Sequence, residues 1–331
     1  MKSEAIPLIS SYKKEGLEFT VVKNNVGLEV TFVNLGGSIF SIKYDNKLMT
    51  SQVADVKDFL NPKIHNGKAV GRVAGRTRSE IIVDKAKVKL ISNDGESVVH
   101  GGDEGISTKM FSQRTFSTQE HVHVVYTYFS KSGESGYPGN ALFEVHYIVS
   151  NNQPKMKVKL LSYVTKTCPI SITVHTFFSL GESSLKNITM KVGSKKYLEM
   201  DKDAYYTGAV KRVPACLDFS KEKPVCQDID DPLLHKGKLD GYEHCFVFDK
   251  VDENVPQVEL KGHKYGVNIF SDFDSVVVYS DKKVDGIKRD NSNEKCRRAI
   301  SIEPQKNPSK SILISRGDEF SYFVRYEFFK K

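Results

Sequence analysis

The sequence lacks several features that would place it in a specialised class. It has no tryptophan, and its 331 residues contain no run of about 18 apolar residues, so a membrane-spanning helix is excluded. The first 16 residues lack the apolar stretch of a secretory signal, which predicts a cytoplasmic protein. The five cysteines form no C-x-x-C pair and are odd in number. Five free thiols are therefore expected, without a disulfide framework or a zinc site.

The charge balance is basic, but no nucleic-acid site is indicated. The 49 Lys and Arg residues exceed the 41 acids, giving a net charge of +8. These cations are dispersed, and the densest cluster, Lys295–Arg298, is short and has no interleaved aromatic residue. A solvated basic surface is the simpler interpretation. We expect no nucleic-acid partner and no membrane partner.

Period-two alternation dominates the chain and predicts an all-β fold. The segments rich in Val, Ile, Tyr, Phe and Thr are 19–23, 28–33, 86–91, 121–129, 143–149, 155–161, 265–270, 276–280 and 320–328. Turn signals such as Asn93-Asp94-Gly95 separate them, and only 54–60 suggests a short helical turn. Many strands without a linker predict one β-sandwich domain over residues 1–331.

A histidine interrupts one strand-like segment. Alternation over 171–178 assigns one face to Ile172, Val174, Thr176 and Phe178, and the other to Thr173, His175 and Phe177. Partial burial among apolar neighbours lowers a histidine pKa, which suits His175 to proton exchange near neutral pH. A hydrogen-bonded core or surface histidine would give the same pattern.

A carboxyl group lies in a second segment, 299–305. Ser301 and Glu303 share one strand face, opposite Ile300 and Ile302. The following proline predicts that the strand ends beside Glu303, where the carboxylate would remain ionised. A solvated glutamate at a strand end has the same signature.

Two further polar segments have either an ordinary or a ligand-binding interpretation. The sequence VVHGGDEG (98–105) places two glycines directly after His100, which permits a sharp turn or the close approach of a ligand. Arg72, Arg76 and Arg78 alternate along one polar edge, which could be solvated or could hold a polar ligand.

Taken in order, seven segments resemble motifs of the aldose 1-epimerase (galactose mutarotase) family. They are GRVAGRT (71–77), VHGGDEGISTKMF (99–111), GESGYPGN (133–140), TVHTFFSL (173–180), DGYEHCFVF (240–248), ISIEPQ (300–305) and LISRGDEFSYFVRYEF (313–328). Each motif is weak by itself, but seven in register along the chain are specific.

The resemblance implies a large antiparallel β-sandwich with an open sugar-binding cleft. It also implies interconversion of the α and β anomers of hexoses such as galactose and glucose, without a cofactor or a metal. By motif, Glu303 is the base that accepts the C1 hydroxyl proton, and His175 is the acid that protonates the ring oxygen. The substrate-binding positions are Arg76, His100, Glu243, Phe177, Gly75 and Val277. A monomer or weak dimer is expected.

The sequence departs from the family pattern on the ligand side. Gly75 and Val174 replace asparagines, Glu243 replaces an aspartate, Val277 replaces a glutamine, and Phe111 stands where the family has tryptophan. These changes are expected to alter sugar specificity or efficiency. Three alternatives remain open: a non-catalytic sugar-binding or regulatory homologue, a hexose-phosphate 1-epimerase, and a glycoside hydrolase that pairs Glu303 with Glu243.

Overall fold

A computed structural model describes residues 7–53, 55–280 and 298–331. Within these ranges, strands form a nine-stranded, a six-stranded and a five-stranded sheet, with four two-stranded ribbons. The neighbouring strands in the three larger sheets pair antiparallel. The all-β prediction is confirmed, and all nine segments predicted from alternation contain strands.

The nine-stranded sheet has the order β11-β12-β13-β14-β28-β24-β23-β18-β21. Its strands are β11 (Ser112–Ser117), β12 (His121–Ser130), β13 (Ala141–Ser150), β14 (Lys155–Val164), β28 (Glu319–Lys330), β24 (Tyr265–Ser271), β23 (Val258–Lys261), β18 (Thr189–Val192) and β21 (Lys223–Pro224). One face of β12 carries fully buried Val122, Val124 and Tyr126, as its alternation predicts.

The six-stranded sheet has the order β17-β26-β25-β22-β19-β20. Its strands are β17 (Phe177–Phe178), β26 (Ile300–Gln305), β25 (Ser275–Ser280), β22 (Glu243–Val247), β19 (Lys196–Met200) and β20 (Tyr206–Arg212). The five-stranded sheet comprises β1 (Leu8–Lys14), β2 (Leu17–Lys23), β3 (Leu28–Val33), β4 (Ser38–Tyr44) and β5 (Lys47–Leu48) in sequence order.

Short elements complete the described chain. The two-stranded ribbons pair β10 (Ser97–Val99) with β7 (Arg76–Arg78), β16 (Thr173–Val174) with β6 (Ala69–Val70), β8 (Glu80–Val83) with β9 (Ala86–Lys89), and β15 (Cys168–Pro169) with β27 (Leu313–Ile314). The helical turn expected near 54–60 is α1 (Val56–Phe59), which the Asp55 side chain caps at its N-terminus. Single 3-10 turns span Ile106–Thr108, Glu134–Gly136, Leu185–Asn187, Ala215–Leu217 and Pro232–His235.

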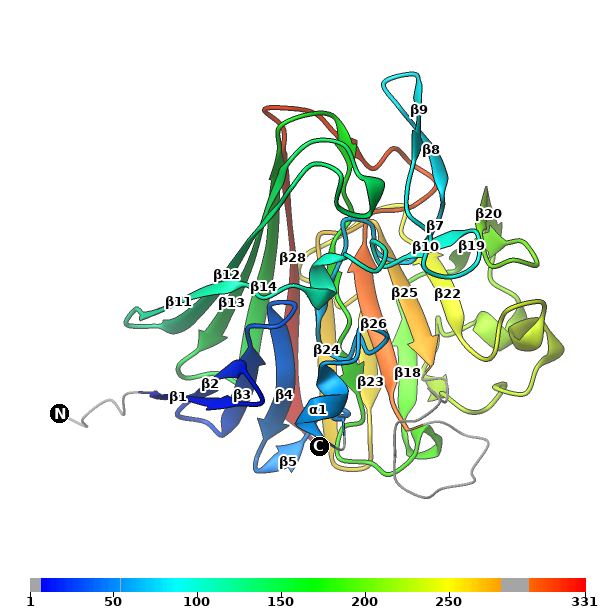
Figure 1. Cartoon of the computed structure of the whole chain (residues 1–331). Helices are drawn as coiled ribbons and strands as arrows, with labels where there is room; N and C mark the ends of the chain where they lie inside the picture. Colours follow the sequence, from blue (N-terminus) through cyan, green and yellow to red (C-terminus); the bar gives the residue numbers. More distant parts are fainter. Residues whose placement is uncertain (1–6, 54, 281–297) are drawn as a thin grey trace.

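The main core lies between the six-stranded and nine-stranded sheets. Figure 1 shows β26, β25 and β22 in front of β24, β23 and β18. Buried side chains from both layers, including Ile302 and Val278 on one side and Ile269 and Leu260 on the other, belong to one hydrophobic cluster. That cluster contains residues from Val22 to Phe328. Because one face of β26 and β25 packs into this core, the opposite face is available for a functional site.

The structure tests the expectation of five free thiols for the cysteines that it describes. Cys168, Cys216 and Cys245 are free and buried, but the expectation of five free thiols is wrong for Cys226, which is disulfide-bonded. Cys296 and most of the Lys295–Arg298 cluster lie outside the described residues.

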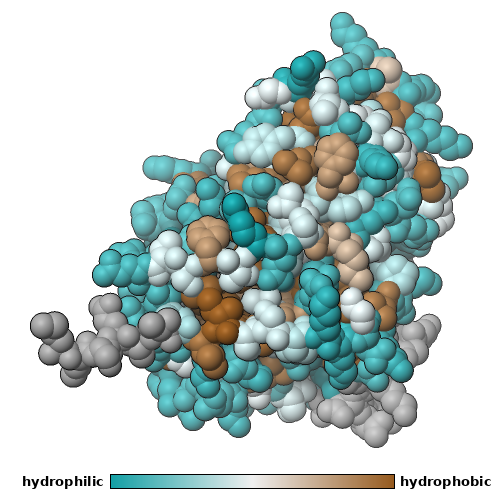
Figure 2. Space-filling model, turned by 60° about the vertical axis from the view of Figure 1, so that its left-hand side comes forward, coloured by the Kyte–Doolittle hydropathy of each residue, from teal (hydrophilic) through white to brown (hydrophobic). Residues whose placement is uncertain are grey.

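The surface is mainly polar on the face that Figure 2 shows, and its apolar side chains occur in separate small groups. Large exposed hydrophobic residues of the chain include Leu8, Tyr12, Phe116 and Phe129. Among the residues that the structure describes, no helix has the length and apolar character needed to cross a bilayer.

Candidate active site

The free face of the six-stranded sheet forms the floor of a pocket. Antiparallel register places Glu303 of β26 opposite Val277 of β25, and Glu243 of β22 opposite Tyr279. Phe177 of β17 lies opposite Ser301. Directly paired residues of neighbouring strands project on the same face of a sheet. Side chains that are distant in sequence therefore meet above one sheet.

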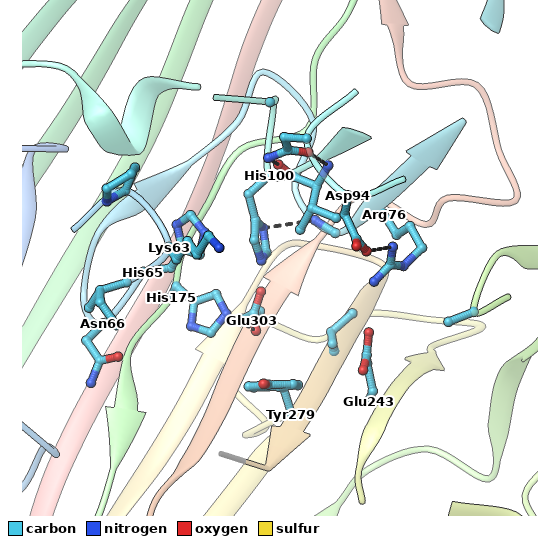
Figure 3. Close-up of a pocket in the computed structure, with 18 of the residues that line it drawn as sticks. Lys63, His65, Asn66, Arg76, Asp94, His100, His175, Glu243, Tyr279 and Glu303 are labelled. Carbon is cyan, nitrogen blue, oxygen red and sulfur yellow. Dashed lines mark hydrogen bonds and ion pairs between the residues drawn. The ribbon is translucent and has the colours of Figure 1, made fainter. Parts of the chain in front are cut away.

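All eight residues predicted for the site line this pocket: Glu303, His175, Arg76, His100, Glu243, Phe177, Gly75 and Val277. The cavity has a volume of about 470 Å³, within the range of small-molecule sites. Figure 3 shows His175 beside Glu303, with His100 and Arg76 across the cavity from Tyr279 and Glu243. The structure thus brings together every position chosen from the sequence, whereas their individual roles stay predictions.

His175 lies in a break between two short strands, not within one continuous strand. β16 ends at Val174 and β17 begins at Phe177, so the predicted alternation over 171–178 is wrong. The His175 backbone is nevertheless fixed, because its N–H donates to Lys68 O at 2.9 Å and its carbonyl accepts from Gly67 N at 2.7 Å. The break lets the imidazole project over the sheet floor. Its ring centroid lies 4.8 Å from that of Phe177.

The central contact of the pocket joins His175 to Glu303. The His175 Nε2 atom lies 3.2 Å from Glu303 Oε1, and its Nδ1 atom lies 3.2 Å from Ser301 Oγ. The two residues are 5% and 2% exposed. One imidazole nitrogen therefore faces the carboxyl group and the other faces a buried hydroxyl group.

Burial controls the protonation of this pair. Desolvation holds the pKa of His175 well below its usual range, and the neighbouring His100 lowers it further. Desolvation also raises the pKa of Glu303 to about 8, opposed by a hydrogen bond from Ser301 and assisted by the Glu243 carboxyl. The predicted fall in the histidine pKa is confirmed in direction. At neutral pH both groups favour their uncharged forms.

The predicted surroundings of Glu303 are wrong in two respects. Glu303 is the fourth of six residues in β26, and Pro304 still pairs with Val276 of β25. The strand continues because a proline lacks only the N–H group and can occupy a ladder position that does not need that donor. As the carboxyl is buried and not solvated at a strand end, it does not stay ionised at neutral pH.

The His-Gly-Gly segment forms the opposite wall. His100 has a positive φ of 51°, and a Cβ atom added to Gly101 would lie 1.9 Å from Gly71 O. Only glycine fits at Gly101, so this turn is sterically specified. The Gly75 N–H donates to His100 Nδ1 at 3.2 Å, which leaves the other ring nitrogen, Nε2, as the N–H donor. Burial lowers the pKa of His100 to about 4, so the ring is neutral.

Arg76 is the arginine of the predicted polar edge that reaches the pocket. It forms an ion pair with Asp94, which also lines the cavity, as Figure 3 shows. Arg72 does not belong to a solvated edge or a ligand clamp. It is 2% exposed, and its guanidinium donates to the carbonyls of Pro138 and Gly139 at 3.0 Å. The Arg72 side chain therefore links its own segment to the loop that contains Pro138 and Gly139.

Two positions described as ligand-side departures lie away from the cavity. Val174 is 1% exposed and Phe111 is 4% exposed, and both belong to the main hydrophobic core. Neither lines the pocket. In contrast, Gly75 and Val277 do line it, and a Cβ atom added to Gly75 would meet nothing within 4 Å. Gly75 thus lines the cavity at a position with open space for a side chain.

Sequence reasoning missed several pocket residues. His65 packs against His100 and His175, with ring centroids 4.7 Å and 6.2 Å away. Its ring is partly buried, and the desolvation holds its pKa well below the usual range. The other missed side chains include Asn66, Asp94, Tyr206 and Tyr279. A polar His-Asn pair after Pro62 was the available signal for the 62–66 loop, but no periodic pattern marks a loop as a wall of a site.

A buried lysine, Lys68, follows the 62–66 loop and contacts the end of α1. Lys68 is 1% exposed, and its Nζ atom donates to Phe59 O at the end of α1 at 2.8 Å. The same atom lies 4.6 Å from the centre of the Phe59 ring. Burial lowers the pKa of Lys68 to about 7. The lysine therefore links α1 to the strand that precedes the arginine motif.

Comparison with known proteins agrees with the motif resemblance. The profile of the family described as aldose 1-epimerase matches residues 19–327. The chain belongs to the aldose 1-epimerase family. It is 22% identical to an aldose 1-epimerase of Escherichia coli K12 over 331 residues, covering 93% of this chain and 94% of the relative. It is also 22% identical to a galactose mutarotase of Sus scrofa, with 91% of each chain covered.

The fold has a solved counterpart. A galactose 1-epimerase from Lactobacillus acidophilus superposes with a TM-score of 0.87 at 22% identity, covering 98% of this chain and 99% of that one. This likeness confirms the galactose mutarotase-like β-sandwich. Membership of the family places the chain among the isomerases.

Proposed function

We propose that the protein is an active aldose 1-epimerase that interconverts the α and β anomers of hexoses such as galactose and glucose. The observation that carries this proposal is the contact of 3.2 Å between His175 Nε2 and Glu303 Oε1 on the floor of a sugar-sized pocket. Anomer exchange needs one proton acceptor and one proton donor beside a small neutral ring. These two groups supply both functions.

The reaction conserves the number of protons on the pair. Transfer of the Glu303 proton to His175 Nε2, across their 3.2 Å contact, converts the neutral resting pair into the reactive ionic pair. Ionised Glu303 then accepts the C1 hydroxyl proton while protonated His175 gives its Nε2 proton to the ring oxygen. The bond between C1 and the ring oxygen breaks, and the open-chain aldehyde now faces a neutral carboxylic acid and a neutral imidazole. Rotation about C1–C2 and reclosure on the other carbonyl face reverse both transfers. Burial favours the neutral pair over the ionic pair, so it favours the open-chain stage over the ionic pair that starts the reaction.

The remaining pocket side chains suit a hydroxyl-rich ligand. The neutral His100 offers an N–H donor, Arg76 offers a guanidinium, and Glu243 offers an acceptor. Tyr279 and Phe177 add flat ring surfaces 5.8 Å and 4.8 Å from His175. This set supports the substrate-binding roles predicted for Arg76, His100 and Glu243.

Polarimetry tests the proposal. Freshly dissolved α-D-glucose and α-D-galactose are followed with the wild type, with Glu303→Gln, and with Glu80→Gln. Glu80 is an exposed carboxyl on β8 that does not line the pocket. The wild type and Glu80→Gln should accelerate mutarotation, and Glu303→Gln should lose at least about 100-fold of that rate.

Other results would contradict the proposal. A Glu303→Gln variant with nearly normal turnover would show that Glu303 is not the catalytic base. No acceleration by the folded wild type with either sugar would refute the proposed activity on free hexoses, and hexose 6-phosphates would be assayed next. A cytoplasmic location, a monomeric or weakly dimeric state, and the independence from cofactors and metals stay predictions.

A further inference from the structure

Ser301 lies within the ISIEPQ segment, but neither the motif resemblance nor the pocket lining gives it a role. It lies two residues before Glu303 on β26, so both side chains project on the same face of the strand. Ser301 is 0% exposed, and it does not line the cavity. Its hydroxyl is therefore covered by neighbouring side chains and does not face the cavity.

The hydroxyl contacts both members of the pair. Its Oγ atom lies 3.2 Å from His175 Nδ1, and it also forms a side-chain hydrogen bond with Glu303. In the ionic form of the pair the Glu303 carboxylate can only accept, so the Ser301 O–H donates to Glu303. The Ser301 oxygen then remains to accept from the Nδ1–H of His175. In the ionic pair this is the one arrangement of protons that satisfies all three groups.

We infer that Ser301 is a positioning residue that keeps His175 protonated at Nδ1, so that only Nε2 gains and loses the catalytic proton. This inference rests on the proposed function. In the ionic pair, the Nδ1–H donates to Ser301 and the Ser301 O–H donates to the Glu303 carboxylate. In the neutral pair the Nδ1–H remains in place. Ser301 therefore supports the ionic form against the burial that opposes it, and it fixes the nitrogen that faces the sugar.

The first experiment compares Ser301→Ala with Ser275→Ala. Ser275 is an equally buried serine on the neighbouring strand β25, and its hydroxyl donates to Gln305 O at 2.8 Å. Ser301→Ala should lower kcat about 10- to 100-fold with little change in KM, the scale of a hydrogen bond to a charged group. Ser275→Ala should retain kcat.

The pH profile separates positioning from a general packing role. Removal of the Ser301 hydrogen bond should move the alkaline limb of kcat/KM to higher pH, because that bond lowers the pKa of Glu303. The titratable side chains that interact with Glu303 include His175, Glu243, Tyr206, Cys245 and Tyr326, and all are retained in the variant. An unchanged alkaline limb with a lower kcat would overturn the inference.

A spectroscopic measurement tests Ser301 independently of activity. The imidazole ¹⁵N shifts of His175 in the free wild type, assigned with His175→Gln, should show a protonated Nδ1 and an unprotonated Nε2 at neutral pH. A protonated Nε2 would refute the inference even if Ser301→Ala does not fold. If the wild type lacks mutarotase activity but shows the protonated Nδ1, the proposed function fails and the positioning contact stands.

Discussion

Replacement of Glu303 by glutamine should stabilise the fold by an amount that grows as the pH rises. Glutamine has nearly the same shape as glutamic acid but does not ionise. In the folded wild type the carboxyl is buried and has a pKa of about 8, compared with an ordinary value of 4.5. Between these two values, the folded chain keeps a proton that the unfolded chain has lost, so the wild type loses stability with rising pH.

The magnitude follows from the two pKa values of Glu303. Each pKa unit corresponds to about 1.36 kcal/mol, so the whole interval is worth at most about 5 kcal/mol. The contribution of Glu303 to the free energy of unfolding is fully present below pH 4.5 and has been lost above pH 8. The free energy of unfolding of Glu303→Gln, relative to the wild type, should therefore rise by up to about 4 kcal/mol between pH 5 and pH 8.

Lys68→Met should show the opposite pH dependence of stability relative to the wild type. Burial lowers the pKa of Lys68 from 10.5 to about 7, so the wild type gains stability as the pH rises between these values. Methionine removes the buried charge. The advantage of Lys68→Met should be constant below pH 7 and should shrink by about 3 kcal/mol at most by pH 9.

The assay is urea unfolding of the three proteins at several pH values from 5 to 9. Opposite pH trends for the two variants, each in its own window, would support the argument from burial. Parallel curves for the wild type and Glu303→Gln across pH 5 to 8 would refute it, because they would show that Glu303 titrates equally in the folded and unfolded chains.

Two further predictions concern activity. The kcat/KM of the wild type should fall as the pH rises through about 8, because the single proton shared by Glu303 and His175 is then lost and no acid remains. A kcat/KM that stays constant up to pH 10, measured by polarimetry, would contradict this. Gly75→Asn should lower KM for galactose or glucose about 3- to 10-fold, since one added hydrogen bond is worth about 1 kcal/mol. Asparagine tolerates the φ of 78° at this open position, and an unchanged or raised KM for both sugars would show that the amide finds no hydroxyl group.

The strands were predictable from sequence because their signal is local. Val122, Val124 and Tyr126 are fully buried on one face of their strand, and a strand that packs one face on a core buries every second side chain. The break around His175 was not predictable in this way. Both faces of 171–178 are buried, so alternation carries no information there, and the pairing of β16 with β6 and of β17 with β26 decides where each short strand ends.

The eight candidate site residues were found by motif, since chemistry-bearing side chains were flanked by recognisable neighbours. His65 and Tyr206 were missed because each enters the pocket through long-range packing. Val174 was misplaced for a related reason: a position next to His175 in sequence points into the core when the backbone turns between two strands.

The sequence by itself determined the β-rich architecture, the family and the residue types available for acid–base chemistry. Only the tertiary structure decided their protonation and their partners. Burial is a property of all the elements that surround a group, so the raised pKa of Glu303 depends on β25, β22 and the loops above them. The contact between Ser301 and His175 joins residues 126 positions apart. Such a contact exists only after the sheets have assembled.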